Sequence, residues 1–296
     1  YARTWGTYKI ILDSNGLNYQ GEDDTYTVEY NTDGETLNIV YVDATKGWIP
    51  TLADVAIPVP ATQKAIFALG ADAGSPIYTS LSNLVSSAGV VASDTAEVAG
   101  VTKRDSCAAA TYGSDKGITG YGTTGSVTGV TNLISNAGVI ATDVAVVGTA
   151  RQTPGCSAYG SDKAIFAYGY SSGSLSMSNL VSNTGVVGAD VSGVGTARLG
   201  PSGVGYSTDL AIFAFGAEAP SYVAMSNLVT NQGVIGTDVS AVASAKGYTA
   251  ATKYGNTKAV YAYGYNHTVS PDYLSFSNLV SDVGVISADI TGVGTG

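Results

Sequence analysis

The strongest constraint on the fold is a segment of thirteen residues that the chain repeats five times. It reads SNLVSNTGVVGAD at 178–190, and the Asn of its NL pair recurs at Asn83, Asn132, Asn179, Asn227 and Asn278. In every copy a Gly follows this Asn by six residues and an Asp follows it by eleven, without insertions. A fixed period of this kind indicates one supersecondary unit that is copied along the chain.

A second repeated segment stands upstream of each copy and sets the spacing. It reads KAIFAYG at 163–169, and its five versions start at 64, 116, 163, 210 and 258, so the period is 47 to 52 residues. A basic residue stands twelve residues before four of these starts, at Arg104, Arg151, Arg198 and Lys246. Periods of about 40–50 residues are typical of propeller blades, whereas helical repeats take about 33–34.

Each unit predicts four short strands. In the third unit these are GCSAYG (155–160), KAIFAYG (163–169), SMSNLVS (176–182) and VVGADV (186–191). The chain's 38 Gly and 20 Tyr fit short strands joined by tight turns. One such unit cannot bury both faces of its sheet, so the units must stack on one another. The sequence predicts an all-β fold with a five-bladed propeller over 51–296, in repeats at about 52–103, 104–150, 151–197, 198–245 and 246–296.

The first 50 residues lack the repeat and predict a separate module. Four segments read as strands, YKIIL (8–12), TYTVEYN (25–31), TLNIVYVD (36–43) and GWIPTL (47–52), and TDGE at 32–35 is a favourable hairpin turn. We expect residues 1–50 to form a small acidic β module that serves as a connector or an oligomerisation unit. The segment WIPTLADVAIPVP (48–60) is also a candidate for the inner strand of the first repeat.

The order of these elements resembles the kelch motif of β-propellers. A basic residue, a small-residue strand, an aromatic strand ending in Gly and two outer strands (SNLVS and VVGAD) follow one another as in kelch units. The repeats are more closely similar to the kelch-like arrays of tailed-phage virion and tail-fibre proteins, over residues 52–296. The double Gly of kelch units is single here, and Val187 stands in place of the outer Trp. The resemblance implies an extracellular virion protein that forms homo-oligomers, typically trimers.

Charge and hydropathy exclude several classes of partner. The chain has 13 basic and 23 acidic residues, a formal charge of −10. Nucleic acids and anionic membranes bind basic surfaces, so we expect neither as a partner. No apolar run reaches the length of a membrane-spanning helix, so no membrane insertion is expected. Because the sequence begins with Tyr1 and not with Met, we expect a processed or partial chain.

Repeated aspartates are the first candidates for catalysis, and they occupy one position in every repeat: Asp94, Asp143, Asp190, Asp238 and Asp289. Carboxylate catalysis needs two groups in unequal environments, which identical positions do not supply. We therefore predict a structural Asp that bonds nearby backbone amides at a turn, and we place the Asp-Lys pairs at 115–116 and 162–163 in turns. No phosphate loop or nucleophile elbow is present, so we expect no enzymatic activity and no cofactor.

Metal and thiol chemistry are weakly indicated. The acidic segment at 13–24 is either a loose calcium loop or a solvated loop, and the second reading is preferred because the alternation of an EF-hand is missing. His267 has no His or Cys at ligand spacing, so we predict no metal site. NHT at 266–268 fits the glycosylation sequon. Cys107 and Cys156 are either small buried apolar residues or a disulfide.

Length variation is concentrated in the connection between the KAIFAYG and SNLVS segments. The distance from its Gly to the NL Asn varies from 10 to 14 residues, and the loops are rich in Tyr, Ser and Gly. This composition is typical of adaptable binding loops, and Tyr also stacks on sugar rings. We expect this loop and the connection between repeats to emerge at the same end. The candidate contacts are Tyr78, Tyr222, His267 and Tyr273, supported by a ring of Arg104, Arg151, Arg198 and Lys246.

The alternative interpretation is that the loops vary only because surface loops tolerate length changes. The basic residues would then only satisfy backbone carbonyls at the edges of the blades. The leading hypothesis is a phage tail-fibre or adhesin subunit that binds a host-surface polysaccharide or protein, together with other virion proteins. The second is a structural decoration or fibre-forming protein without an external ligand. A glycan-cleaving enzyme comes third, because no pair of unequal carboxylates is readable.

Overall fold

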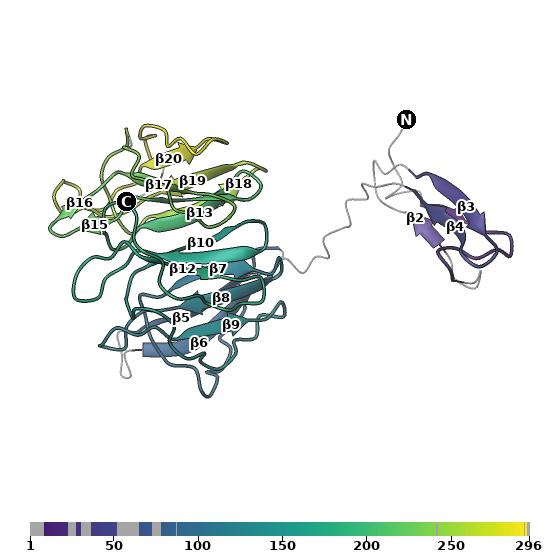
Figure 1. Ribbon diagram of the computed structural model, residues 1–296, viewed down its shortest axis with the longest axis horizontal. Helices are drawn as coiled ribbons and strands as arrows, with labels where there is room; N and C mark the ends of the chain where they lie inside the picture. The colour runs from purple at the N-terminus through teal and green to yellow at the C-terminus, as the bar shows by residue number, and fades with distance from the viewer. Residues whose placement is uncertain are drawn as a thin grey trace. The chain divides into compact units, whose positions relative to one another are not determined.

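The computed structural model divides the chain into two compact units, Tyr1–Gln63 and Lys64–Gly296. It describes residues 9–22, 28–30, 37–51, 65–72, 78–86, 88–240, 242–292 and 294. Every regular element in these ranges is a β-strand (Figure 1), so the all-β prediction is confirmed. Within them, no helix is long and apolar enough to cross a membrane.

The first unit contains two antiparallel strand pairs. β1 (Ile10–Leu12) pairs with β2 (Val28–Tyr30), and β3 (Ile39–Asp43) pairs with β4 (Gly47–Pro50). The four predicted strands are thereby confirmed, and the predicted turn at 32–35 lies outside the described residues. The structure ends this unit at residue 63, compared with the predicted boundary at 50.

The segment 48–60 does not supply the first repeat with an inner strand as far as it is described. Trp48 and Ile49 pair with Tyr41 and Val40 in β3, and the rings of Tyr41 and Trp48 meet edge to face with centroids 5.4 Å apart. These contacts place the start of the segment in the first unit. Residues 52–60 lie outside the described residues.

The second unit is a series of antiparallel sheets, with one main sheet for each repeat. In repeats 2–5 the small-residue strand pairs with the KAIFAYG-type strand, which pairs with the NL strand. These strands are β7 (Ala108–Tyr112), β8 (Lys116–Gly120) and β9 (Thr131–Ile134); β10 (Gly155–Tyr159), β11 (Lys163–Ala167) and β12 (Ser178–Val181); β13 (Ser202–Tyr206), β14 (Leu210–Ala214) and β17 (Ser226–Val229); and β18 (Ala250–Tyr254), β19 (Lys258–Ala262) and β20 (Ser277–Val280). Repeat 1 contributes β5 (Ala65–Ala71) and β6 (Tyr78–Val85), and repeat 4 adds the short pair β15 (Ala217–Glu218) and β16 (Ser221–Tyr222).

The predicted fourth strand is reduced to two isolated bridges in each repeat. In repeat 3 they join Ser178 to Val191 and Val181 to Val187, so the outer segment has one extra residue between them. Asn179 Nδ2 donates hydrogen bonds to the carbonyl oxygen of Gly188 at 3.0 Å and to Asp190 Oδ1 at 2.9 Å. A bulge, held by a side chain instead of a regular ladder, therefore replaces the fourth strand.

The sheets follow one another in chain order along a stack. In Figure 1 the strands β5 and β6 lie at one end of this unit, and β19 and β20 lie at the other. Between these ends, β7 packs on β10, β10 on β13, and β13 on β18. The structure therefore shows a succession of sheets, and it does not show the closed five-bladed ring that the sequence predicts.

The same aromatic pair recurs at the interfaces between repeats 2 to 5. The sixth residue of the KAIFAYG segment adopts a positive φ and meets the aromatic residue of the next repeat's strand edge to face. The pairs are Tyr121–Phe166, Tyr168–Phe213 and Phe215–Tyr261, with centroids 5.1, 5.7 and 5.4 Å apart. All six rings are fully buried. Each pair of this geometry contributes about 0.5–1.5 kcal/mol beyond its area burial.

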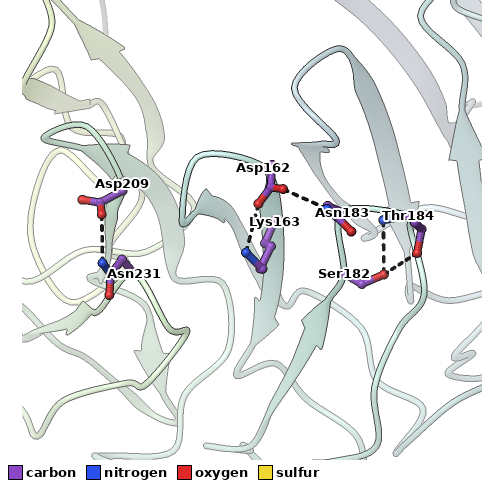
Figure 2. Close-up of polar contacts among 7 residues, drawn as sticks. All are labelled: Asp162, Lys163, Ser182, Asn183, Thr184, Asp209 and Asn231. Carbon is purple, nitrogen blue, oxygen red and sulfur yellow. Dashed lines mark hydrogen bonds and ion pairs between the residues drawn. The ribbon is translucent and has the colours of Figure 1, made fainter.

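Side chains also link the turns at the end of the strands away from the variable loops (Figure 2). The Asp162 carboxylate accepts hydrogen bonds from Lys163 Nζ and Asn183 Nδ2, both at 3.0 Å. In the next repeat Asp209 accepts from Asn231 at 3.0 Å. Repeat 2 holds the equivalent set of Asp115, Lys116 and Asn136. The prediction that the Asp-Lys pairs belong to turns is confirmed for Asp115 and Asp162, and Lys116 and Lys163 begin the strands that follow.

Candidate functional site

The basic residues of the repeats are completely buried, with 0% exposure at Arg104, Arg151, Arg198 and Lys246. Arg198 donates from Nε to the carbonyl oxygen of Phe215 at 2.8 Å and from Nη1 to that of Thr196 at 3.1 Å. Its Nη2 group donates to Asn227 Oδ1 at 2.7 Å. The predicted surface ring of cations is therefore wrong, because all four side chains are buried inside the protein. The alternative, that they satisfy backbone carbonyls, is confirmed for Arg104, Arg151 and Arg198. Lys246 instead donates to the side chain of Asn278, with 2.7 Å between Nζ and Oδ1.

Three of these cations also lie over an aromatic ring of the preceding repeat. The guanidinium carbon of Arg198 is 3.9 Å from the ring centroid of Tyr168. The equivalent pairs are Arg151 over Tyr121 at 3.9 Å and Lys246 over Phe215 at 4.8 Å. A desolvated cation over a ring contributes about 2 kcal/mol. Burial lowers the pKa of Arg198, and the nearby Tyr168 and Asp238 oppose this shift. The cations therefore join neighbouring repeats and are not available to a ligand.

The repeated Asp closes the same hydrogen-bond network. Asp238 accepts from the backbone nitrogen of Thr196 at 3.0 Å, from its hydroxyl at 2.8 Å, and from Asn227 Nδ2 at 2.9 Å. Burial alone would raise the pKa of Asp238, but the hydrogen bonds of Asn227 and Thr196 and the charge of Arg198 lower it. The predicted structural role is confirmed, although Thr196 lies 42 residues away and not in a local turn.

An aromatic cluster lies on the variable loops of repeats 4 and 5 and consists of Tyr222, Tyr265, His267 and Tyr273. The ring centroid of Tyr222 is 6.0 Å from that of Tyr265 and 5.4 Å from that of His267. The Tyr265 ring lies 5.2 Å from Tyr273, and His267 Nδ1 lies 3.3 Å from the Tyr222 hydroxyl. Four rings from two repeats thus form one continuous patch.

Backbone pairing positions these rings. Gly247 and Tyr265 exchange backbone hydrogen bonds of 3.0 and 2.9 Å, and Tyr265 forms a bridge with Tyr273 across the loop. A Cβ atom at Gly247 would lie only 3.2 Å from the Tyr222 ring, so the missing side chain allows Tyr222 to approach. The connection between repeats and two variable loops therefore build the cluster together.

The buried Asn266 anchors the loop beneath the cluster. Its Nδ2 group donates to the carbonyl oxygen of Ala245 at 2.8 Å, and its Oδ1 accepts from the backbone nitrogen and the hydroxyl of Thr268 at 2.9 and 2.6 Å. The sequon at 266–268 is thus a structural element, because its amide nitrogen is buried and already engaged.

One side of the cluster is open to solvent. Tyr273 is 65% exposed and His267 is exposed, whereas Tyr222 and Tyr265 are half-buried. Burial raises the pKa of Tyr222, and Tyr248, Tyr265 and Asp272 add to this shift, so its hydroxyl remains protonated at neutral pH. The loops 217–225 and 265–276 carry Glu218 and Asp272 but neither Lys nor Arg.

A groove of about 360 Å³ lies on the same face and is lined by Ser106, Gln152, Thr153, Tyr170, Leu199 and Tyr248. Bridges pair Gln152 with Tyr170 and Gly247 with Tyr265, so the residue after each buried cation lies beside the first residue of a variable loop. The prediction that the two connections share one end is confirmed. We call this surface, the groove and the aromatic cluster together, the loop face.

The structure brings together three of the four predicted aromatic contacts. Tyr222, His267 and Tyr273 belong to the aromatic cluster, whereas Tyr78 begins β6 in repeat 1 and is not part of it. Sequence reasoning missed Tyr265 and Tyr170. Both directly follow the closing Gly of a KAIFAYG-type segment, and this shared position was the available signal.

Metal and thiol positions give no second site in the described part of the chain. No group of three or more His, Cys, Asp or Glu residues there could hold a metal ion. Asp13 of the acidic segment accepts a hydrogen bond from the backbone of Asn15 at 2.8 Å, and residues 23–24 lie outside the described ranges. Cys107 and Cys156 are free thiols, and burial raises the pKa of Cys156.

No protein-family model matches the sequence, and no match is found among curated proteins. The geometry of the loop face is therefore the basis for assigning a function.

Proposed function

We propose that the protein is a phage tail-fibre or adhesin subunit that binds a neutral glycan of the host surface through the aromatic cluster. The observation that carries this proposal is the continuous patch of Tyr222, Tyr265, His267 and Tyr273 on the variable loops of repeats 4 and 5. The kelch-like resemblance of the repeats supports the virion context.

The chemistry of the patch suits a sugar. Exposed tyrosine rings offer flat apolar faces to the C–H groups of a pyranose, while the hydroxyl of Tyr222, the imidazole of His267 and the Asp272 carboxylate can bond sugar hydroxyls. The surrounding loops carry two acids and no Lys or Arg, which disfavours an acidic polysaccharide. A neutral glycan is therefore the preferred ligand class.

Binding of this kind does not require a closed kelch-like ring. The aromatic cluster comes entirely from repeats 4 and 5, and the buried Arg and Asp networks hold these repeats in register.

The test is binding of labelled protein to intact candidate host cells, with purified neutral surface polysaccharide as competitor. We expect saturable binding that the competitor removes and that Tyr273→Ala weakens at least about tenfold, a loss of about 1.4 kcal/mol. The matched control is Tyr78→Ala, at the start of β6 in repeat 1 and outside the aromatic cluster. Equal losses in both variants, or no binding by the folded protein to any candidate surface, would contradict the proposal.

The second candidate is a fibre-forming or decoration protein without an external ligand. It is favoured by a different observation, the uncovered ends of the stack.

A further inference from the structure

The last repeat exposes side chains whose counterparts are buried in the interior. Tyr263 is 46% exposed, whereas the equivalent Tyr121, Tyr168 and Phe215 are at 0%. Tyr254, at the end of β18, is 39% exposed, whereas the equivalent Tyr112, Tyr159 and Tyr206 are at 2–4%. Leu279 in β20 is exposed as well. These three residues define what we call the C-terminal end face.

The first repeat exposes the opposite half of the same interface. Phe67 in β5 is 63% exposed, whereas its equivalents Phe166 and Phe213 are fully buried. A Cβ atom at Gly89 would meet nothing within 4 Å. At the equivalent Gly185 a Cβ atom would lie 2.7 Å from Leu133 and 3.0 Å from Tyr112 of the preceding repeat. We call Phe67 and the open surface over Gly89 the N-terminal end face.

The internal interfaces show how these two end faces fit. In each, the φ-positive aromatic residue of one repeat packs on the strand Phe or Tyr of the next. The Leu of the NL pair covers the turn Gly of the next repeat, as Leu180 covers Gly233 and Leu228 covers Gly284. Tyr263 and Leu279 are equivalent to the aromatic residue and the Leu that the preceding repeat supplies. Phe67 and Gly89 are equivalent to the strand aromatic residue and the turn Gly that the following repeat supplies.

We propose that the protein assembles head to tail, with the C-terminal end face of one copy packed on the N-terminal end face of a second copy. The contact repeats the packing between neighbouring repeats, with Tyr263 on Phe67 and with Leu279 and Tyr254 over Gly89. It is heterologous, so it generates rings of several copies if the rotation closes and filaments if it does not. A second copy is the preferred occupant because each end face already matches its partner in size and shape within this chain.

The N-terminal end face is apolar. Repeat arrays normally end in units with a polar outer face, whereas residues 65–71 contain no charged or amide side chain. The proposal uses no residue of the aromatic cluster, so its test is independent of glycan binding.

The test is sedimentation velocity of the 296-residue protein between about 1 and 100 µM, where micromolar affinities are resolved. Phe67→Glu places a charge on the N-terminal end face, and Leu279→Glu places one on the C-terminal end face. The matched control is Val186→Glu, at an exposed apolar position of repeat 3 outside both end faces. Tyr254→Ser repeats the test at the C-terminal end face if Leu279→Glu lowers the melting temperature.

We expect the unaltered protein and Val186→Glu to form larger species as concentration rises. Phe67→Glu and Leu279→Glu, each alone, should stay monomeric, and their equimolar mixture should give a dimer and nothing larger, because one intact pair of end faces remains. A monomeric unaltered protein, association of either end variant by itself, or a mixture without dimers would overturn the proposal. So would a strongly reduced melting temperature of monomeric Phe67→Glu, since Phe67 would then be covered within its own chain.

Discussion

The interior and terminal repeats carry nearly the same residues in opposite environments. Residues 65–68, 164–167 and 211–214 all read AIFA, and all lie on the strand that pairs with the NL strand of their repeat. Phe166 and Phe213 are fully buried, whereas Phe67 is largely exposed. The difference shows that a repeat does not bury its own aromatic residue: the preceding repeat does.

The hydrogen bonds of the repeated Asp also differ between the interior and the first repeat. Asp238 accepts hydrogen bonds from Thr196 and Asn227. Asp94 in the first repeat accepts one from Asn83, and among the described residues it has no hydrogen bond from a Thr. The first repeat also lacks a basic residue twelve positions before its KAIFALG segment, where the sequence has Leu52. The equivalent outer segment therefore has fewer hydrogen bonds in the first repeat than within the array.

The largest expected effect is a difference in the free energy of unfolding between alanine variants of two AIFA segments, one in the interior and one at the end of the array. Phe213→Ala should lower the free energy of unfolding by about 3–5 kcal/mol, because it leaves a cavity between repeats 3 and 4. Phe67→Ala, measured by urea unfolding at a concentration where the protein is monomeric, should lower it by less than about 0.5 kcal/mol. Similar losses in the two variants would mean that Phe67 is covered, and the comparison would fail.

A smaller effect is expected from the repeated Asp. Asp238→Ala removes three hydrogen bonds at a partly solvated site and should cost about 1–2 kcal/mol, and Asp94→Ala should cost less. The pKa of Asp238 is lowered in the folded protein, so its contribution is present above the unfolded value of about 3.9 and is lost as the pH falls through the folded pKa. Below about pH 4, the free energy of unfolding should therefore depend less steeply on pH for Asp238→Ala than for the unaltered protein. An unchanged pH slope would contradict this role.

Local signals predicted the strands but not their neighbours. The Gly, Asn and Asp turns and the spacing of the NL pair are short-range features, and they located the strands of repeats 2–5. The role of Arg198 could not be read in this way, because Tyr168 and Asn227 lie 30 and 29 residues from it in the sequence. Its charge indicated a surface residue, and only the stacked repeats supply enough partners to bury it.

The candidate site was predicted to a similar extent. Loop length and composition pointed to Tyr222, His267 and Tyr273, because variable tyrosine-rich loops are a local property. The contribution of Tyr265 depends on its pairing with Gly247 in the connection between repeats, which the sequence does not display. Tyr78 has a similar composition around it but no aromatic contact within the described ranges, so residue type alone did not distinguish it.

Backbone hydrogen exchange of the monomeric protein, read strand by strand, tests the central claim most directly. Protection depends on burial and on neighbouring sheets, so β11 and β14 should exchange slowly while β5 and β18 exchange much faster. Raising the protein concentration should then slow exchange in β5 and β18 and leave β14 unchanged. Equal protection of β5, β14 and β18 in the monomer would show that the end faces cover each other within one chain, and it would contradict the open stack.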